Sequence, residues 1–158
     1  MKNKILIIIT ILLFYGCGFT PIYKDENFSN LSIASIEFSG DRIINNILNT
    51  KLFKYKNLNS KSNYELKINT SYSKIILAKD TSGNATNYEL RVYVNVKTNK
   101  KNKNNDEKNI EFNYSEKNNI KNENNNINQK NYEKQLIINL ASTISRKIAF
   151  DLSNLNDN

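Results

Sequence analysis

The stretch Tyr-Glu-Leu-Arg-Val-Tyr-Val-Asn-Val-Lys, residues 88–97, alternates strictly between two kinds of side chain. Its even-numbered positions hold Tyr, Leu and three Val, and its odd-numbered positions hold Glu, Arg, Tyr, Asn and Lys. Because successive side chains of a β-strand point to opposite faces, this period of two predicts a strand with one buried and one solvated face. The sheet that contains the strand is therefore expected to be covered on one side only.

A second strand and a turn precede this stretch. Residues 79–84, Lys-Asp-Thr-Ser-Gly-Asn, have the composition of a tight turn, and residues 64–77 alternate between apolar and polar side chains. The alternation shifts phase after Tyr72, to Ile75 and Leu77. We therefore expect an antiparallel hairpin whose first strand changes its buried face midway.

Further out in both directions, the sequence predicts two helices and two more strands. Apolar residues recur with helical spacing over 41–54, where Asp41 is suited to cap the first turn, and again over the longer segment 132–153. Alternating apolar residues predict a strand over 31–38, with a bulge where the phase slips, and a short strand over 110–114.

These elements follow one another in the order β-α-β-β-β-α. Two one-sided helices and a one-sided sheet can bury their apolar faces only against each other, so we expect an α+β fold. Its form is a two-layer sandwich, with both helices on one face of a mostly antiparallel four-stranded sheet, in a single domain over 31–155. The Asn- and Lys-rich segments 99–109 and 118–131 are too polar to be buried and are expected to be mobile loops.

The N-terminus has the features of a signal peptide over residues 1–16. Lys2 and Lys4 form a positive region, and residues 5–15 are apolar except for one Thr. At 1.5 Å per residue a helix of this run covers roughly 16 Å, about half of a bilayer core. The segment is therefore expected to be a cleaved signal and not a membrane-spanning helix.

Cys17, the only cysteine, follows Gly16 directly after the apolar run. A bacterial lipoprotein carries at this place the thiol that receives diacylglycerol, and cleavage would fall between Gly16 and Cys17. The alternative is an ordinary buried cysteine in an N-terminal membrane anchor. If Cys17 is acylated, its lipid is the only prosthetic group that we expect, and residues 17–30 are a tether. Gly18 in place of Asp favours sorting to the outer membrane.

Composition excludes several classes of function. The 158 residues include no His and one Cys, so the usual zinc sites and histidine-based catalytic triads are absent. Asp80 and Glu89 flank the predicted hairpin, where turn chemistry and a solvated strand face explain them. We therefore expect no catalytic residues, no metal ligands and no enzymatic activity. The net charge of +8 accompanies 31 Asn and 20 Lys, a bias typical of AT-rich coding sequence, so it is weak evidence for an anionic partner.

One predicted surface could bind a ligand. The polar face of the strand over 88–97 presents Arg91, Tyr93 and Lys97, and Tyr72 and Lys74 are expected nearby. The face is either an ordinary solvated surface, or a site for an acidic amphipathic ligand or a partner in which Arg91 and Lys97 make contact. The basic loop over 100–108 reflects compositional bias or binds an anionic partner. Nucleic acid is not expected there, because its recognition needs aromatic residues interleaved with the basic ones and a periplasm-bound protein would rarely meet it.

Four segments resemble a known family, the lipopolysaccharide-assembly lipoprotein LptE in its alphaproteobacterial form. The opening Cys-Gly-Phe-Thr-Pro-Ile-Tyr, residues 17–23, is similar to the family's usual start of the mature chain. Residues 41–48 are similar to its first helix, 85–90 to the entry of its central hairpin, and 140–149 to its C-terminal helix.

The resemblance implies a non-enzymatic outer-membrane lipoprotein whose partners are the large β-barrel LptD and lipopolysaccharide. Such a protein assembles and plugs the barrel from within its lumen and assists the insertion of lipopolysaccharide into the outer leaflet. A polar-surfaced domain is compatible with a water-filled lumen. An auxiliary lipoprotein of a lipid-exporting ABC transport system remains an alternative.

Overall fold

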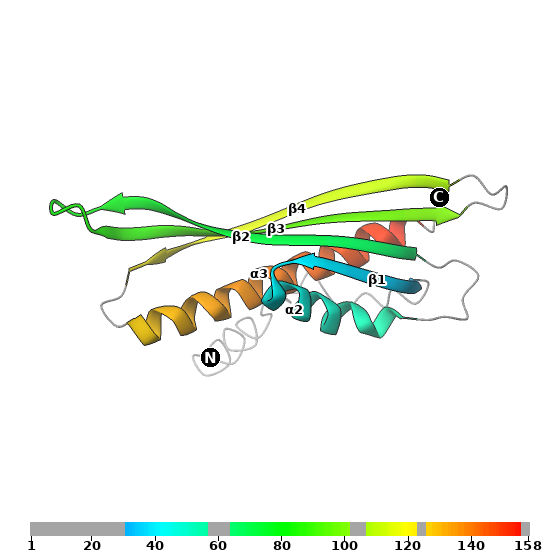
Figure 1. Cartoon of the computed structure of the whole chain (residues 1–158), viewed down its shortest axis with the longest axis horizontal. Coiled ribbons are helices and arrows are strands. Elements are labelled where there is room, and N and C mark those ends of the chain that lie inside the picture. Colours follow the sequence, from blue (N-terminus) through cyan, green and yellow to red (C-terminus); the bar gives the residue numbers. More distant parts are fainter. Residues whose placement is uncertain (1–30, 57–63, 102–106, 123–125, 156–158) are drawn as a thin grey trace, which may run out of the picture.

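The computed structural model describes residues 31–56, 64–101, 107–122 and 126–155, which form two layers (Figure 1). A twisted four-stranded sheet makes one layer of this described part, and two α-helices lie against one of its faces. The elements, in chain order, are β1 (Ile33–Gly40), α2 (Arg42–Leu52), the 3₁₀ turn η1 (Phe53–Tyr55), β2 (Tyr64–Lys79), β3 (Ala85–Lys101), β4 (Glu107–Lys121) and α3 (Asn126–Asn154). The predicted α+β sandwich and its β-α-β-β-β-α order are confirmed.

The strands lie side by side in the order β1-β2-β3-β4. β1 runs parallel to β2, and the other neighbours are antiparallel. In β2–β3 Ile68 pairs with Val96, and in β3–β4 Val94 pairs with Tyr114, so the even-numbered residues of all three strands share one face. This face contacts the helices.

The junction of β1 and α2 depends on Gly40 and Asp41. Gly40 has a positive φ of 92°, a conformation that a side chain disfavours. Asp41 caps the helix as predicted, because its Oδ1 accepts hydrogen bonds from the backbone N–H groups of Ile43 at 2.9 Å and Ile44 at 3.0 Å. The N–H of Asp41 also donates to the carbonyl of Thr70 at 3.0 Å, which ties the start of α2 to β2.

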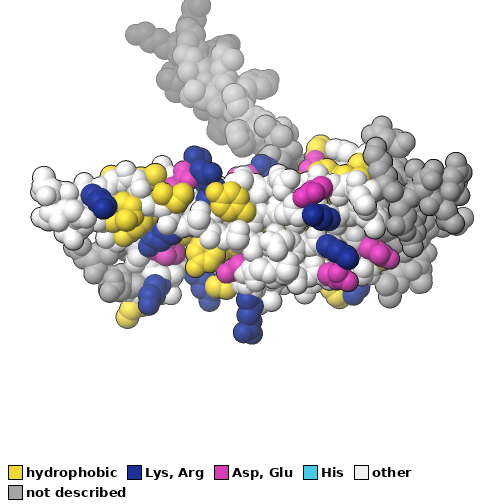
Figure 2. Space-filling view, turned by 45° about the horizontal axis from the view of Figure 1, so that its top comes forward, with side chains coloured by type: hydrophobic (Ala, Val, Ile, Leu, Met, Phe, Trp, Pro, Cys, Tyr) yellow, Lys and Arg dark blue, Asp and Glu magenta, His cyan; other side chains and the backbone are white. Residues whose placement is uncertain are grey.

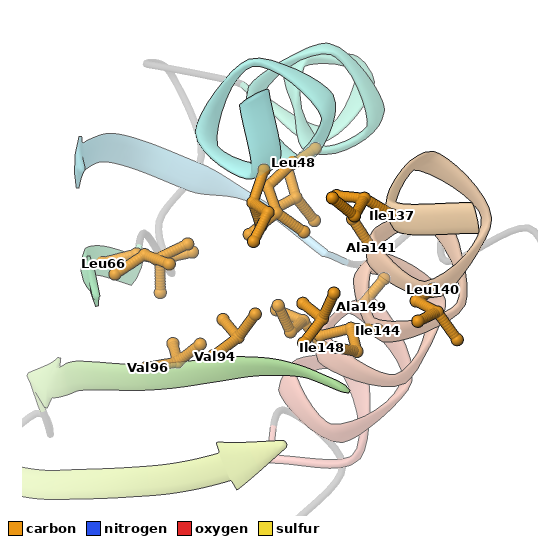
Figure 3. Close-up of a cluster of buried hydrophobic side chains, with 14 of the residues drawn as sticks. Leu48, Leu66, Val94, Val96, Ile137, Leu140, Ala141, Ile144, Ile148 and Ala149 are labelled. Atoms are coloured by element: carbon orange, nitrogen blue, oxygen red, sulfur yellow. The ribbon is translucent and has the colours of Figure 1, made fainter. Parts of the chain in front are cut away.

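The core lies between the sheet and the two helices (Figure 3). Aliphatic side chains of the sheet and of both helices meet there at 2 % exposure or less. Burial of this apolar surface is the main stabilising contribution to the fold. Its members include Leu66, Ile68, Val92, Val94 and Val96 from the strands, Ile44, Leu48 and Leu52 from α2, and Ile144, Ile148 and Leu152 from α3. None of the helices in the described part of the chain is long and apolar enough to cross a membrane.

The Asn- and Lys-rich segments form more regular structure than predicted. β3 continues to Lys101 and β4 begins at Glu107, so both ends of the predicted loop 99–109 are strand. Within the predicted loop 118–131, residues 118–121 belong to β4 and residues 126–131 to α3. Ladder hydrogen bonds come from the backbone, so polar side chains that point into solvent do not prevent a strand from continuing. The remaining residues of both loops lie outside the described part, as do residues 1–16 and 17–30.

β2 does not change its buried face midway, contrary to the prediction. Ile75, Ile76 and Leu77 are each about half exposed, so the apolar run lies outside the core on both faces of the strand. The cause is the position of α2, which starts beside Thr70 and follows the half of β2 that pairs with β1. The far part of the β2–β3 hairpin extends beyond α2 (Figure 1).

Candidate functional site

The face of the sheet that points away from the helices is the candidate site, and we call it the outer face. It carries odd-numbered side chains of the strands, arranged in rows by the strand register. Basic and acidic side chains lie side by side on it (Figure 2). Its charged side chains include those of Glu37, Lys67, Glu89, Arg91, Lys97, Glu111 and Lys117.

Arg91 lies in a tight ionic cluster on this face. Its Nη2 donates to Oε1 of Glu89 at 2.6 Å, and Lys117 Nζ of β4 donates to Oε2 of the same carboxylate at 2.9 Å. The side chain of Glu89 is only 9 % exposed. The hydrogen bond from Lys117, helped by Arg91 and opposed by desolvation, lowers the pKa of Glu89 below its ordinary value. The Glu89 hydrogen bond in turn raises the pKa of Arg91.

Arg91 also holds the ring of Tyr93. Its guanidinium carbon is 5.8 Å from the ring centroid, within the range of a cation–π contact, and Nη1 is 3.4 Å from the Tyr93 hydroxyl. Glu89 and Tyr93 thus engage the two terminal nitrogens of the guanidinium, whereas its Nε is buried without a hydrogen-bond partner in the described part of the chain.

Lys97 is much less constrained. Its Nζ is 3.9 Å from Oε2 of Glu111, and the neighbouring Lys67 Nζ is 3.8 Å from Oε2 of Glu37. The Lys97 side chain is 62 % exposed and that of Glu111 50 %. Exposed pairs of this kind contribute about 0–1 kcal/mol, so an anion can compete for the Lys97 ammonium at little cost.

Arg91 and Lys97 point to the same face but do not form one site. Six residues of extended chain separate them, about 20 Å at the usual rise of a strand. Rows that carry Asn95 and Tyr93 lie between the two cations. A single small anion therefore contacts one of them and not both.

Tyr72 and Lys74 lie on the opposite face, contrary to the prediction. β2–β3 pairing sets Tyr72 opposite Val92 and Lys74 opposite Leu90, and paired residues share a face. Lys74 is bound there by Glu133 of α3, and its ammonium lies 4.0 Å from the centroid of the Tyr88 ring. The prediction was wrong because both residues have even numbers, and β2 keeps its even-numbered side chains on the face of the helices as far as Ile76.

Lys117 is the member of this site that sequence reasoning missed. It falls beyond the strand predicted over 110–114, and only the full length of β4 sets it opposite Arg91. A usable signal was present, because Ile120 continues the even-numbered apolar phase of Phe112 and Tyr114. In the described ranges, no three His, Cys, Asp or Glu side chains come together as metal ligands would.

Comparison with known proteins identifies the family. The family model of the lipopolysaccharide-assembly protein LptE matches residues 28–152, which include nearly the whole sandwich. The chain belongs to the LptE family. This confirms the resemblance seen in the sequence, and membership assigns the chain to lipopolysaccharide assembly as an envelope lipoprotein. No curated protein matches the chain significantly.

Solved structures share the LptE fold at low sequence identity. Rare lipoprotein B from Shewanella oneidensis is 14 % identical, with a TM-score of 0.56, over 77 % of this chain and 98 % of that one. A minor lipoprotein from Acinetobacter baumannii is 11 % identical, with a TM-score of 0.52, over 80 % and 92 %. Lipoprotein B from Nitrosomonas europaea is 15 % identical, with a TM-score of 0.50, over 80 % and 87 %. At these identities the likeness establishes the fold alone.

Proposed function

We propose that this LptE-family chain is a non-enzymatic outer-membrane lipoprotein that assembles and plugs the β-barrel LptD and assists the insertion of lipopolysaccharide into the outer leaflet. The observation that carries the proposal is the family match over residues 28–152, which spans the described sandwich almost completely. The chemical groups on the outer face are ion pairs, amides and hydroxyls, and they suit a binding role better than catalysis.

The outer face supports a location inside a barrel. The lumen of a large outer-membrane barrel is polar and hydrated, so a domain within it needs a polar skin. The odd-numbered residues of β3 from Glu89 to Lys97 are Glu, Arg, Tyr, Asn and Lys, and those of β4 are similarly polar. β3 and β4 can thus stand in the lumen with most of their apolar residues turned to the helices, while Ile75 of β2 is half exposed on the outer face.

The proposed anchor is a diacylglycerol on Cys17, formed when the signal peptide is cleaved after Gly16. Acyl chains contribute about 0.8 kcal/mol for each buried CH₂, so two or three of them hold a protein on the membrane essentially permanently. A short tether from Cys17 to the start of β1 then keeps the sandwich close to the outer membrane, within reach of the barrel.

For lipopolysaccharide itself, Lys97 is the better candidate contact of the two predicted residues. Its ammonium is exposed and only loosely paired, whereas Arg91 is held by Glu89 and Tyr93. Changing Lys97→Gln should weaken binding of purified lipopolysaccharide, and Lys134→Gln on α3 is the matched control because it removes the same charge from an exposed position on the helix layer. Equal binding by the two variants would remove Lys97 from the site while leaving the barrel proposal intact.

The decisive experiment is affinity purification of the full chain from membranes in mild detergent, with mass spectrometry of what accompanies it. A large outer-membrane barrel at a 1:1 ratio is the expected result. Recovery of an inner-membrane transporter would favour the auxiliary role in lipid export, and recovery of no stoichiometric partner would refute the plug. A Cys17→Ser variant, analysed for loss of acylation and of membrane association, tests the anchor separately.

A further inference from the structure

A strip of uncharged hydrogen-bonding side chains crosses the outer face between the Arg91 cluster and Lys97. Strand register sets Asn69, Asn95 and Asn113 in one row across β2, β3 and β4. The adjacent row, one step toward Arg91 on the same face, is Ser71, Tyr93 and Ser115. We call these six residues the amide strip. Along β3 its residues Tyr93 and Asn95 stand between the charged side chains of Arg91 and Lys97.

The amide strip is hollowed. A depression of about 280 Å³ is lined by all six of its residues. A second depression, of about 450 Å³, shares Asn69 and Asn95 with the first and continues to Lys67 and Lys97. Ligand sites usually measure about 300–1,000 Å³, so the two adjoining hollows together have room for a small extended ligand.

The hydrogen bonds within the strip leave polar atoms available. Asn95 Nδ2 donates to Oδ1 of Asn113 at 2.8 Å and to Oε1 of Glu111 at 2.6 Å, and Asn69 Nδ2 donates to Oγ of Ser39 at 2.8 Å. Both N–H groups of Asn95 are used in these bonds, whereas its Oδ1, the Nδ2 of Asn113 and the Oδ1 of Asn69 make no hydrogen bond within the described part of the chain. Amides and hydroxyls both donate and accept, so they match a ligand whose own groups do the same, which is the property of neutral hydroxyls.

Tyr93 adds an aromatic surface in the middle of the strip. Its side chain is 38 % exposed, and Arg91 fixes the ring from the side of the ionic cluster. A ring that is immobilised in this way can bind without losing further rotamer freedom. Its negative π-face attracts the weakly positive C–H groups on the apolar face of a sugar ring.

We propose that the amide strip binds a neutral saccharide, with its hydroxyls on Asn69, Asn95 and Asn113 and one sugar ring against Tyr93. The proposal rests on the proposed function for the source of the saccharide, because a chain that assists lipopolysaccharide insertion meets the sugar chain of lipopolysaccharide. The glycan strands of the cell wall offer the same chemistry in the same compartment. An anionic ligand is disfavoured on the strip itself, because none of its six side chains carries a charge.

The test uses the full chain in detergent, labelled with ¹⁵N, so that the side-chain amide signals of the strip can be followed directly. Two probes are added separately: the dephosphorylated, delipidated core oligosaccharide of lipopolysaccharide, and a neutral glycan fragment of peptidoglycan. Tyr93→Leu removes the aromatic ring while keeping an apolar side chain. Asn113→Ala removes one amide, and Asn119→Ala is its matched control, since it changes the same exposed residue type on the same strand and face but outside the strip.

At about millimolar saccharide, the affinity expected of a shallow site, the amide signals of Asn69, Asn95 and Asn113 should shift. Tyr93→Leu and Asn113→Ala should each weaken binding at least about fivefold, the loss of roughly 1 kcal/mol, and Asn119→Ala should leave it unchanged. Shifts with only one probe would identify the source. No shift with either probe, or equal weakening by Asn119→Ala, would overturn the saccharide site while recovery of the barrel still supported the proposed function.

Discussion

Replacing Gly40 by alanine tests the junction that positions α2 on the sheet. Gly40 ends β1 with a φ of 92°, and a Cβ built there overlaps the carbonyl oxygen of Thr70 in β2. Gly83, in the β2–β3 turn, has a similar φ of 85° but open space around the same position. The two glycines therefore differ in one respect, whether an added methyl group meets a neighbouring backbone.

The expected free energies follow from this difference. A left-handed backbone costs a residue with a Cβ about 1–2 kcal/mol, and alanine recovers about 0.4–1 kcal/mol by restricting the unfolded chain. Gly83→Ala should thus lose about 0–1.6 kcal/mol of unfolding free energy. Gly40→Ala must also move β1 away from Thr70, which strains the backbone and stretches the Asp41–Thr70 hydrogen bond of 3.0 Å. Overpacking of this kind adds about 1–3 kcal/mol, so the total loss for Gly40→Ala is about 1–5 kcal/mol.

Urea unfolding followed by far-ultraviolet circular dichroism measures both variants in the same buffer. We expect the midpoint of Gly40→Ala to lie clearly below that of Gly83→Ala at an unchanged slope. A stability of about 5–15 kcal/mol leaves room for the variant to remain folded. Equal losses for the two variants would refute the reasoning, because they would show that the contact with Thr70 does not constrain the junction.

Three further changes test other parts of the molecule. The pKa of Glu89 is lowered in the folded state, so its carboxylate stabilises the fold above about pH 4.5 and loses this effect as the pH falls through the folded pKa. Glu89→Gln removes this group and should therefore flatten the decline of the melting temperature between about pH 5 and 3, as measured by thermal unfolding. Ile144→Ala, at a fully buried position, should lower the unfolding free energy by about 2–5 kcal/mol in urea. Tyr114→Phe removes the 2.7 Å hydrogen bond from β4 to Asp151 of α3 and should lower the unfolding free energy by about 1 kcal/mol at pH 7, measured by urea unfolding. A variant as stable as the parent would contradict this.

Sequence patterns predicted the elements whose two sides differ sharply. The strand over 88–97 alternates without a break, and Asp41 is a strong capping residue before an apolar helical face. Both predictions hold, because burial of one face directly selects side chains. The same logic failed at Ile75 and Leu77, where apolar residues lie half exposed beyond the end of α2. The sequence of β2 does not show how far α2 extends along the sheet, and therefore does not show that these two residues lie beyond its cover.

Cross-strand partners were the part of the site that could not be predicted. That Arg91 shares a face with Glu89 follows from a separation of two residues on one strand. The contact of Lys117 with them depends on the register of β4, which backbone hydrogen bonds set. The Asn- and Lys-rich sequence around β4 gives little indication of that register. The prediction that Arg91 contacts a ligand was therefore reasonable from its strand alone, yet the structure pairs its guanidinium with Glu89 and sets it beside the Tyr93 ring.

The outer face offers two kinds of contact to a ligand at neighbouring places, a charged contact at Lys97 and hydrogen bonds at the amide strip. Lys97, exposed and 3.9 Å from its acidic partner, interacts with anions mainly through charge, and salt screens such contacts over about 8–10 Å at physiological ionic strength. The amide strip acts through short hydrogen bonds, which salt changes little. If both proposals hold, intact lipopolysaccharide should lose affinity as salt is raised, but only to a floor set by the neutral strip. Complete loss would leave no role for the strip, and no loss would leave none for Lys97.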